Sequence, residues 1–446
     1  MKKGILYLVC VFTAACSDSG NHHLELPEPG TEENRQHTEW CIEQNEWIYE
    51  QMNHHYFWYT EMPDSGKLDF TQEPPAFFKS VVSSQDRFSW CELNSHYKGE
   101  TMSMPECGFE YQPYKDKNGL SIGRILYVTS DILKKEKIKR GDWIRFLQTS
   151  TNEICIQKGR IEKGRFIGEA TYRYLHPATK ADPLAPTIPL DSVYLVNGRK
   201  IGYVVYDAFE ANTDVIQIAV KFKNKGIDDL ILDLRYNLGG YVATAEYLAS
   251  EIIPKEALGK VYQKQRYNKK ITRETEAELE NGYKYVYFHT GYNIASRNLD
   301  LPRVVILTSE NTASASESTI IGLRPYMQVV TIGTPTYGKD VGSYTIADNR
   351  YKYQLQPITF RYYNALNDST PQIGILPTIR VEDDLNHERG EIKEALLKTA
   401  LEYLTGTVAA KNGMPGDVAE ESGYPVKQGP SSLWRKHRID INSETR

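Results

Sequence analysis

The sequence predicts an α/β domain with a largely parallel sheet, within a chain of 446 residues. Short, nearly all-apolar runs recur between about residues 192 and 404, at residues 201–206, 230–234, 304–307 and 329–332. Stretches of helical length alternate with them, at residues 215–222, 243–253 and 315–323. Continuous apolar runs are typical of strands buried on both faces, and strands alternating with helices are typical of parallel sheets. We therefore expect the α/β domain at residues 190–404.

The chain is too long for one ordinary core, so further units are expected beside this domain. Residues 35–100 predict a small helical unit, because large apolar residues recur there near helical spacing. These residues are Trp40, Trp47, Ile48, Met52 and Tyr56, with Phe77, Phe78 and Val81 after a proline pair. Residues 255–298 interrupt the α/β pattern and predict an insertion with its own hairpin or helix. Residues 405–446 lack periodicity and predict a loosely ordered tail.

Residues 107–175 predict short strands around one short helix. An apolar run ends at Val128, Ser130 or Asp131 can cap a helix, and a turn at Gly141 leads into another strand. This order resembles a PDZ domain, a fold that binds extended peptide ends by adding a strand to a sheet edge. The sequence departs from the usual Ser-Pro-Ala at the helix start and from the usual Ala-Gly before the turn. These departures bear on peptide binding more than on the fold.

The charge of the chain excludes some partner classes. Charged residues make up 25% of the sequence, and the formal net charge of -5 is spread along it. Neither a nucleic acid nor an anionic membrane surface is indicated as a partner. The sequence carries no signal of oligomeric state.

The first residues predict an export signal rather than part of the fold. Lys2 and Lys3 precede an apolar run at residues 5–12 that is too short to span a bilayer as a mature helix. Small residues before Cys16 resemble a bacterial lipoprotein cleavage site, so residues 1–16 are the expected signal, Cys16 the lipidated residue and 17–34 a tether. The alternative is an ordinary secretory signal. Both predict an exported protein of the cell envelope, on a periplasmic or surface face.

Cysteine and histidine spacing gives no metal site. Cys41, Cys91, Cys107 and Cys155 would remain in the mature chain, and their three possible disulfide pairings stay open. No Cys-x-x-Cys or His-x-x-x-His spacing occurs, and adjacent histidines such as His54-His55 point apart on a helix. We expect neither a metal nor an organic cofactor.

Ser314 and Lys339 are the candidate catalytic pair. Ser314 lies between a predicted strand and a predicted helix, where a side chain is exposed at the sheet edge near a positive helix terminus. A serine needs a base, and a lysine serves as one when burial lowers its pKa. No Ser-His-Asp arrangement stands out. The plainer interpretations are that Ser314 only caps the helix and that Lys339 is a solvated loop lysine.

Residues 233–240 supply candidate backbone donors for an oxyanion. Gly239 and Gly240 end a loop that follows a buried strand, and glycine permits close approach of a substrate to the backbone. The plainer interpretation is a tight turn before the next helix, which is compatible with the functional role.

These motifs together resemble the C-terminal processing, or tail-specific, serine proteases. The resemblance covers roughly residues 107–404, and the lysine lies 25 positions after the serine as in that family. It implies a Clp-protease/crotonase-type α/β domain joined to a PDZ domain, with Ser314 as nucleophile and Lys339 as general base. It also implies an oxyanion hole from the N–H groups of Gly239 or Gly240 and of Ala315. Arg235 and Asn237 are expected to fix the loop, and Ser316 is the competing serine with the wrong spacing.

One position departs from this family. Many members have a glutamine four residues after the lysine, where this chain has Ser343. Asp340 beside Lys339 would raise the pKa of the lysine and weaken it as a base. Glu317 is a candidate to take over the orienting role. This departure puts the third catalytic residue in question and leaves the Ser314–Lys339 pair unaffected.

The sequence therefore predicts a serine endopeptidase that cleaves extended polypeptides, with C-terminal tails among the candidate substrates. Ser314 would attack the scissile carbonyl, and Lys339 would pass its proton to the leaving amine. The main alternative is a peptide-binding envelope lipoprotein with a weak or inactive catalytic domain, which the departures at Ser343 and in the PDZ-like helix motivate. A crotonase relative acting on acyl-CoA is a third hypothesis. The Ser–Lys spacing and the PDZ-like segment argue against it.

Overall fold

The computed structural model describes residues 30–94, 108–148, 154–175, 186–210, 212–274, 282–407, 425–428 and 431–435. The predicted signal, Cys16 and most of the predicted tether lie outside these residues, as does Cys107. In the described part of the chain, no helix combines the length and apolarity that crossing a membrane requires.

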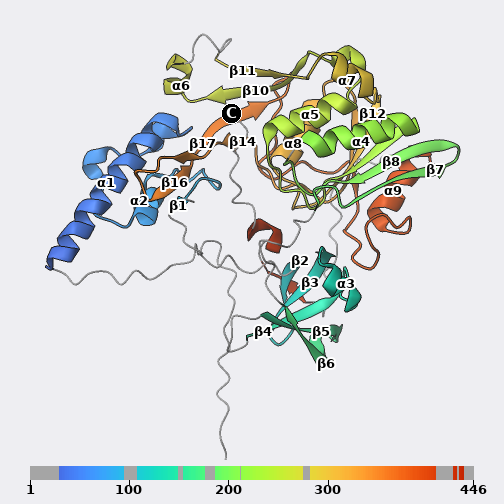
Figure 1. The fold of residues 1–446 in the computed structure, drawn as a ribbon, viewed down its shortest axis with the longest axis horizontal. Helices are drawn as coiled ribbons and strands as arrows, with labels where there is room; N and C mark the ends of the chain where they lie inside the picture. Colours follow the sequence, from blue (N-terminus) through green and yellow to red (C-terminus); the bar gives the residue numbers. More distant parts are fainter. Residues whose placement is uncertain are drawn as a thin grey trace, which may run out of the picture.

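A six-stranded sheet forms the centre of the α/β domain (Figure 1). Its strands lie in the order β18 (Ile379–Arg380), β13 (Gln328–Gly333), β12 (Arg303–Thr308), β9 (Asp229–Asp233), β8 (Arg199–Val205) and β7 (Leu190–Val196). Every neighbouring pair is parallel except β7 with β8. The predicted α/β fold class is confirmed.

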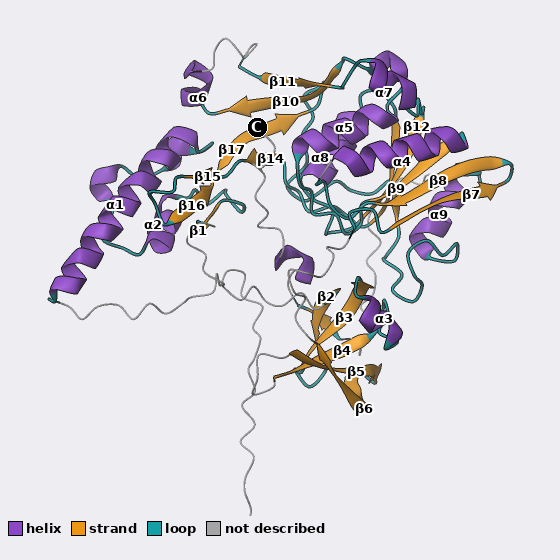
Figure 2. Cartoon of the chain, in the orientation of Figure 1, coloured by secondary structure: helices purple, strands orange, loops and turns teal. Residues whose placement is uncertain are grey.

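Helices cover both faces of this sheet (Figure 2). One face packs against α4 (Asn212–Lys225), α5 (Val242–Ile252) and α8 (Ala315–Leu323), and the other against α9 (Ala395–Leu404). Successive strand residues alternate between the two cores: Val304 and Ile306 face the first, Val305 and Leu307 the second. This is why the central strands are apolar at consecutive positions.

A second, antiparallel sheet lies beside α8. Its order is β11 (Lys284–Tyr287), β10 (Val261–Tyr267), β17 (Ile358–Tyr363) and β14 (Val341–Ser343). Strands β10 and β11 are the hairpin predicted within residues 255–298, and α6 (Lys269–Glu274) and α7 (Tyr292–Arg297) are helices of the same stretch.

The N-terminal unit contains the predicted helices, α1 (Glu32–His55) and α2 (Pro74–Val81), but it is not purely helical. Its strand β1 (Trp90–Leu93) pairs with β16 (Tyr353–Gln356), which also pairs with β15 (Ile346–Ala347). Its core residues, among them Ile48 and Phe77, share a hydrophobic cluster with Leu355 and Ile358. The unit therefore shares both a sheet and a core with the second half of the chain.

A separate antiparallel module, the six-stranded module, lies below the α/β domain in Figure 1. Its strands are β2 (Phe109–Lys115), β3 (Ser121–Val128), β4 (Trp143–Gln148), β5 (Ile154–Glu162), β6 (Arg165–Leu175) and β19 (Val426–Lys427). The predicted short helix is α3 (Asp131–Lys135), and Ser130 Oγ accepts a hydrogen bond from the N–H of Leu133. Gly141, at the predicted turn, has a φ of +81° that favours glycine.

The tail prediction needs correction where the structure describes that segment. Residues 425–428 include β19, and residues 432–435 form a 3-10 helix, η5 (Ser432–Arg435), packed against β2. A two-residue strand has no visible periodicity, and its pairing partner lies more than 300 residues earlier. Local sequence therefore gave no sign of it.

Cys41 and Cys91 are free thiols. A disulfide between these two is therefore not formed in this structure.

Candidate active site

Ser314 lies at the turn between β12 and α8, as the sequence predicts. Its backbone has φ +56° and ψ -114°, a conformation that costs a non-glycine residue about 1–3 kcal/mol. The side chain is partly exposed, whereas its neighbours Ala313 and Ala315 are buried. The strained turn thus lifts one serine of this segment out of the core.

Ser316 has the opposite environment. Its side chain is fully buried, and its hydroxyl donates a 2.9 Å hydrogen bond to the carbonyl oxygen of Asn237. The structure thus separates an accessible serine from a buried serine two positions later.

Residues 234–241, the glycine loop, are held against Ser314 by Asn237. The Asn237 carbonyl accepts from the N–H of Ala313 at 3.1 Å, and its Oδ1 accepts from the N–H of Gly239 at 2.8 Å. A Cβ on Gly239 would lie 2.8 Å from Ser314 Cβ and 2.9 Å from the Ala315 nitrogen. Only glycine permits this approach.

The three predicted oxyanion donors differ in availability. The N–H of Gly239 is engaged by Asn237, whereas those of Gly240 and Ala315 have no hydrogen-bond partner among the described residues. Both are near Ser314, since Ala315 follows it and Gly240 follows Gly239.

Arg235 is buried, and its contacts are structural rather than catalytic. Its guanidinium is fully buried and contacts the carboxylates of Asp233, Asp383 and Glu394. These contacts join the end of β9 to the segment before α9, in line with the expected role in fixing the loop.

Lys339 lies beyond β13, in the loop before β14, and is half-buried. Burial lowers the pKa of Lys339 to about 8, while the carboxylates of Asp86 and Glu317 act in the opposite direction. The amine lies 5.4 Å from the centre of the Phe88 ring. No hydrogen bond joins Lys339 Nζ to Ser314 Oγ, both of which the structure describes.

Glu317 holds the two candidate catalytic segments together. Its fully buried carboxylate accepts from the N–H groups of Ser314 at 3.0 Å, Lys339 at 2.9 Å and Gly338 at 2.7 Å. It also accepts from Thr336 Oγ1 at 2.5 Å. Burial raises the pKa of Glu317, and these hydrogen bonds act against that rise. Glu317 thus orients the Lys339 backbone, and no ion pair joins its carboxylate to the Lys339 amine, both of which the structure describes.

Two predicted neighbours of Lys339 face elsewhere. Ser343 Oγ accepts from Gln356 Nε2 at 3.0 Å, and an Asp340 oxygen lies 3.0 Å from Nε of Arg361. Tyr362 contacts Lys339 as well: its hydroxyl donates to the Lys339 carbonyl at 2.6 Å and lies 3.5 Å from the Ser314 carbonyl oxygen.

The N-terminal unit contributes a part of this site that sequence reasoning missed. Arg87 Nη2 donates to the carbonyl of Gly338 at 3.0 Å, Phe88 faces the Lys339 amine, and Asp86 is its main neighbouring anion. Asp86 is fixed by Tyr56, whose hydroxyl donates to it at 2.8 Å. No local motif marks these residues, because their role depends on a contact across some 250 positions.

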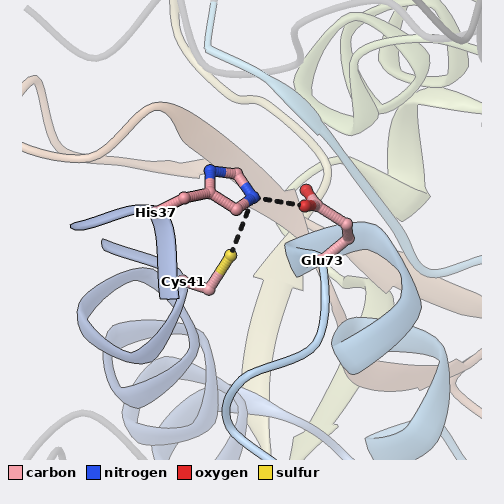
Figure 3. A group of neighbouring side chains, drawn as sticks. All are labelled: His37, Cys41 and Glu73. Carbon is pink, nitrogen blue, oxygen red and sulfur yellow. Dashed lines mark hydrogen bonds and ion pairs between the residues drawn. The ribbon is translucent and has the colours of Figure 1, made fainter. Parts of the chain in front are cut away.

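A second group of chemically reactive side chains lies in the N-terminal unit. His37 and Cys41, one turn apart on α1, lie beside Glu73 (Figure 3). Their His-x-x-x-Cys spacing differs from the Cys-x-x-Cys and His-x-x-x-His spacings that typically mark a metal site. His37 Nε2 lies 2.6 Å from Glu73 Oε1 and 3.6 Å from Cys41 Sγ. Two ligands of a tetrahedral zinc ion would be about 3.4 Å apart. The His37–Glu73 distance is that of a hydrogen bond, so the group ties α1 to the start of α2 without an ion.

Two models of one known protein family match the parts of the chain that form this site. Residues 200–381 match the model of peptidase family S41, and residues 43–90 match the peptidase S41 N-terminal domain. The chain belongs to peptidase family S41. The match to the N-terminal domain includes Tyr56 and Asp86, which line the Lys339 side of the site.

Relatives of this S41 protein include C-terminal processing proteases. The carboxyl-terminal-processing protease of Synechocystis is 25% identical over 48% of this chain and 45% of its own length. The carboxy-terminal processing protease CtpB of Bacillus subtilis is 27% identical over 53% of this chain and 47% of its own length. This chain thus spans less than half the length of these curated relatives.

One solved structure resembles nearly the whole S41 protein. An S41-family protein from Bacteroides fragilis covers 81% of this chain and 98% of its own, with 27% identity and a TM-score of 0.67. The similarity therefore extends beyond the central sheet.

Proposed function

We propose that this S41 protein is a serine endopeptidase with Ser314 as nucleophile and Lys339 as general base. The observation that carries the proposal is the convergence of a strained, accessible serine and a lysine of lowered pKa on the single carboxylate of Glu317. At a pKa near 8, about one lysine in ten is neutral at pH 7, against about four in ten thousand for an ordinary lysine.

In the proposed mechanism, Ser314 Oγ attacks the scissile carbonyl carbon while the neutral amine of Lys339 takes its proton. The N–H groups of Gly240 and Ala315 are the available donors for the oxyanion, and Gly239 would join them only by leaving Asn237. Lys339 then gives its proton to the leaving amine, and water hydrolyses the acyl-enzyme. Ser314 and Lys339 make no hydrogen bond without substrate, so we expect the contact to form on binding.

The substrate in this proposal is an extended polypeptide, with C-terminal tails as the first class to test. The names of the relatives support it, as does the antiparallel six-stranded module with its resemblance to a peptide-binding domain. We also retain export and lipid attachment at Cys16 as proposals that rest on the N-terminal sequence alone.

Cleavage of casein by the chain from residue 17 tests this function. We expect Ser314→Ala and Lys339→Ala each to lower turnover by about a thousandfold or more. Ser316→Ala is the matched control: it removes a buried hydroxyl, so it should lower stability by about 1 kcal/mol and keep turnover. Cleavage retained by Ser314→Ala would refute the assignment. Absence of cleavage with every form would favour a peptide-binding protein.

A further inference from the structure

Residues 425–428 and 431–433 contact both the six-stranded module and the S41 domain. Their strand β19 pairs antiparallel with β2, with Val426 opposite Lys115 and Lys427 opposite Tyr114. The N–H of Gln428 extends the pairing by donating to the Pro113 carbonyl at 2.9 Å. Without β19, β2 would be the edge strand of its sheet.

The next described residues, 431–433, are buried between the two parts. Ser432 Oγ accepts from the N–H of Tyr111 at 2.7 Å and donates to the Glu110 carboxylate. Leu433, 6% exposed, packs in one apolar cluster with Leu126 of β3 and with residues of the S41 domain, Tyr236, Leu238 and Leu385. Tyr236 and Leu238 belong to the glycine loop.

The same segment also touches the loop that carries the nucleophile. Ser431 Oγ donates to Asn311 Oδ1 at 2.7 Å, and both residues are buried. Lys427 forms an ion pair with Glu310. These partners lie three and four positions before Ser314. One short segment therefore contacts the β2 edge, the glycine loop and the Ser314 loop at once.

An extended segment added to an open sheet edge is a recurring mode of peptide recognition, in which backbone pairing gives affinity and side-chain pockets give specificity. Here the pairing residues are 426–428, and Val426 is 60% exposed, so its side chain adds little. The specific contacts come from the hydroxyls of Ser431 and Ser432 and from Leu433.

We propose that the C-terminal segment 425–433 is a ligand of the chain's own β2 edge, and that it competes there with polypeptide substrates. The site would take an extended segment followed by two small hydroxyl residues and a large apolar residue. Displacement of this segment would open the β2 edge and release its hold on the loops of Ser314 and of Gly239. The competition for turnover rests on the proposed peptidase function, whereas the binding itself does not.

A binding assay on a Ser314→Ala background tests the proposal without requiring catalysis. The probe is a fluorescent peptide of residues 424–435, measured by anisotropy against the chain from residue 17. Gln428→Pro removes the N–H that pairs with Pro113, and its matched control Gln428→Ala keeps it. Among the described residues, the Gln428 side chain itself bonds only to the carbonyls of Val426 and Lys427. Leu433→Asp, with Leu433→Met as control, removes the apolar anchor independently.

We expect the probe to bind Gln428→Pro and Leu433→Asp at least about tenfold more tightly than the unsubstituted chain, because a tethered competitor acts at roughly millimolar effective concentration. The two control variants should resemble the unsubstituted chain. Equal binding by all forms, or no binding by either disrupted form, would overturn the proposal.

With Ser314 restored, the same two variants should cleave casein faster than the unsubstituted chain, and added unlabelled peptide should reverse the gain. Tighter probe binding without any cleavage would leave the self-ligand standing and reject the peptidase function. Cleavage that is the same in all forms, with probe binding also unchanged, would reject the self-ligand alone.

Discussion

Lys339 is balanced between burial, which lowers its pKa, and the carboxylates of Asp86 and Glu317, which raise it. Glu317 is occupied by backbone N–H groups, so Asp86 is the charge that can be removed with least disturbance. Asp86 Oδ1 accepts from the N–H groups of Phe88 and Ser89, and asparagine retains that oxygen. Asp86→Asn, which replaces one carboxylate oxygen by an amide NH2 group, therefore tests whether the Lys339 amine is the base.

Asp86→Asn should shift the acid limb of kcat/KM to lower pH. The limb is expected near pH 8, because the base must be neutral, and loss of the Asp86 charge lowers the pKa of Lys339 further. Turnover at pH 6 should then rise by about twofold or more, since a larger fraction of Lys339 is neutral. Tyr56→Phe, which keeps the Asp86 charge, is the control. A limb that stays in place would argue against Lys339 as the titrating base.

The start of α8 and the loop before β14 act as one element through Glu317. Four donors converge on this buried carboxylate, one from α8's own N-terminus and three from residues 336–339. The position of Lys339 relative to Ser314 is thus set by a side chain that takes no part in proton transfer.

Glu317→Gln should destabilise the protein by about 3 kcal/mol, because the amide NH2 group would face buried N–H donors and leave some unsatisfied. Turnover should fall as well, through displacement of Lys339. Urea unfolding and casein cleavage measure the two effects. Thr336→Ser keeps its hydroxyl and should change stability little, and a Glu317→Gln protein as stable as this control would contradict the assigned role.

At the scale of the whole molecule, the six-stranded module is fixed to the S41 domain by buried charge as well as by the C-terminal segment. Arg140 is 4% exposed, and it donates to the Leu126 carbonyl at 2.6 Å within the module and to Asp383 at 2.6 Å across the interface. Arg235 contacts the same carboxylate oxygen, Asp383 Oδ1, at 2.8 Å. Together the two guanidiniums hold the pKa of Asp383 well below its usual value, against the effect of burial.

Arg140→Ala should therefore loosen the module from the rest of the chain. Loss of one partner from a buried ion network costs about 3–5 kcal/mol, which would appear as an earlier calorimetric transition and a larger radius of gyration in solution scattering. Arg160→Ala removes an exposed arginine of the same module and should leave both unchanged. Identical behaviour of the two variants would show that the Arg140 ion network does not hold the module.

Much of the fold followed from the sequence because burial leaves a local pattern. The helix predicted at residues 315–323 has those bounds in the structure. The apolar run at 304–307 lies in β12, and the run at 230–234 lies in β9 except for its last residue. The strand-to-helix position of Ser314 and the close approach of Gly239 were also predictable, since a turn and a missing Cβ are properties of adjacent residues. Resemblance supplied the pairing of Ser314 with Lys339.

The sequence by itself thus determined the class of the fold and the residue types available for chemistry, because periodicity and turn residues act over a few positions. Only the tertiary structure decided which side chains surround Lys339. It assigned Ser343 to Gln356, Asp340 to Arg361, and Asp86 and Phe88 to the lysine. It also added β1 to β16 and β19 to β2. The contacts of Asp86, Phe88, β1 and β19 join residues more than 200 positions apart, so their energies leave no trace in either segment alone.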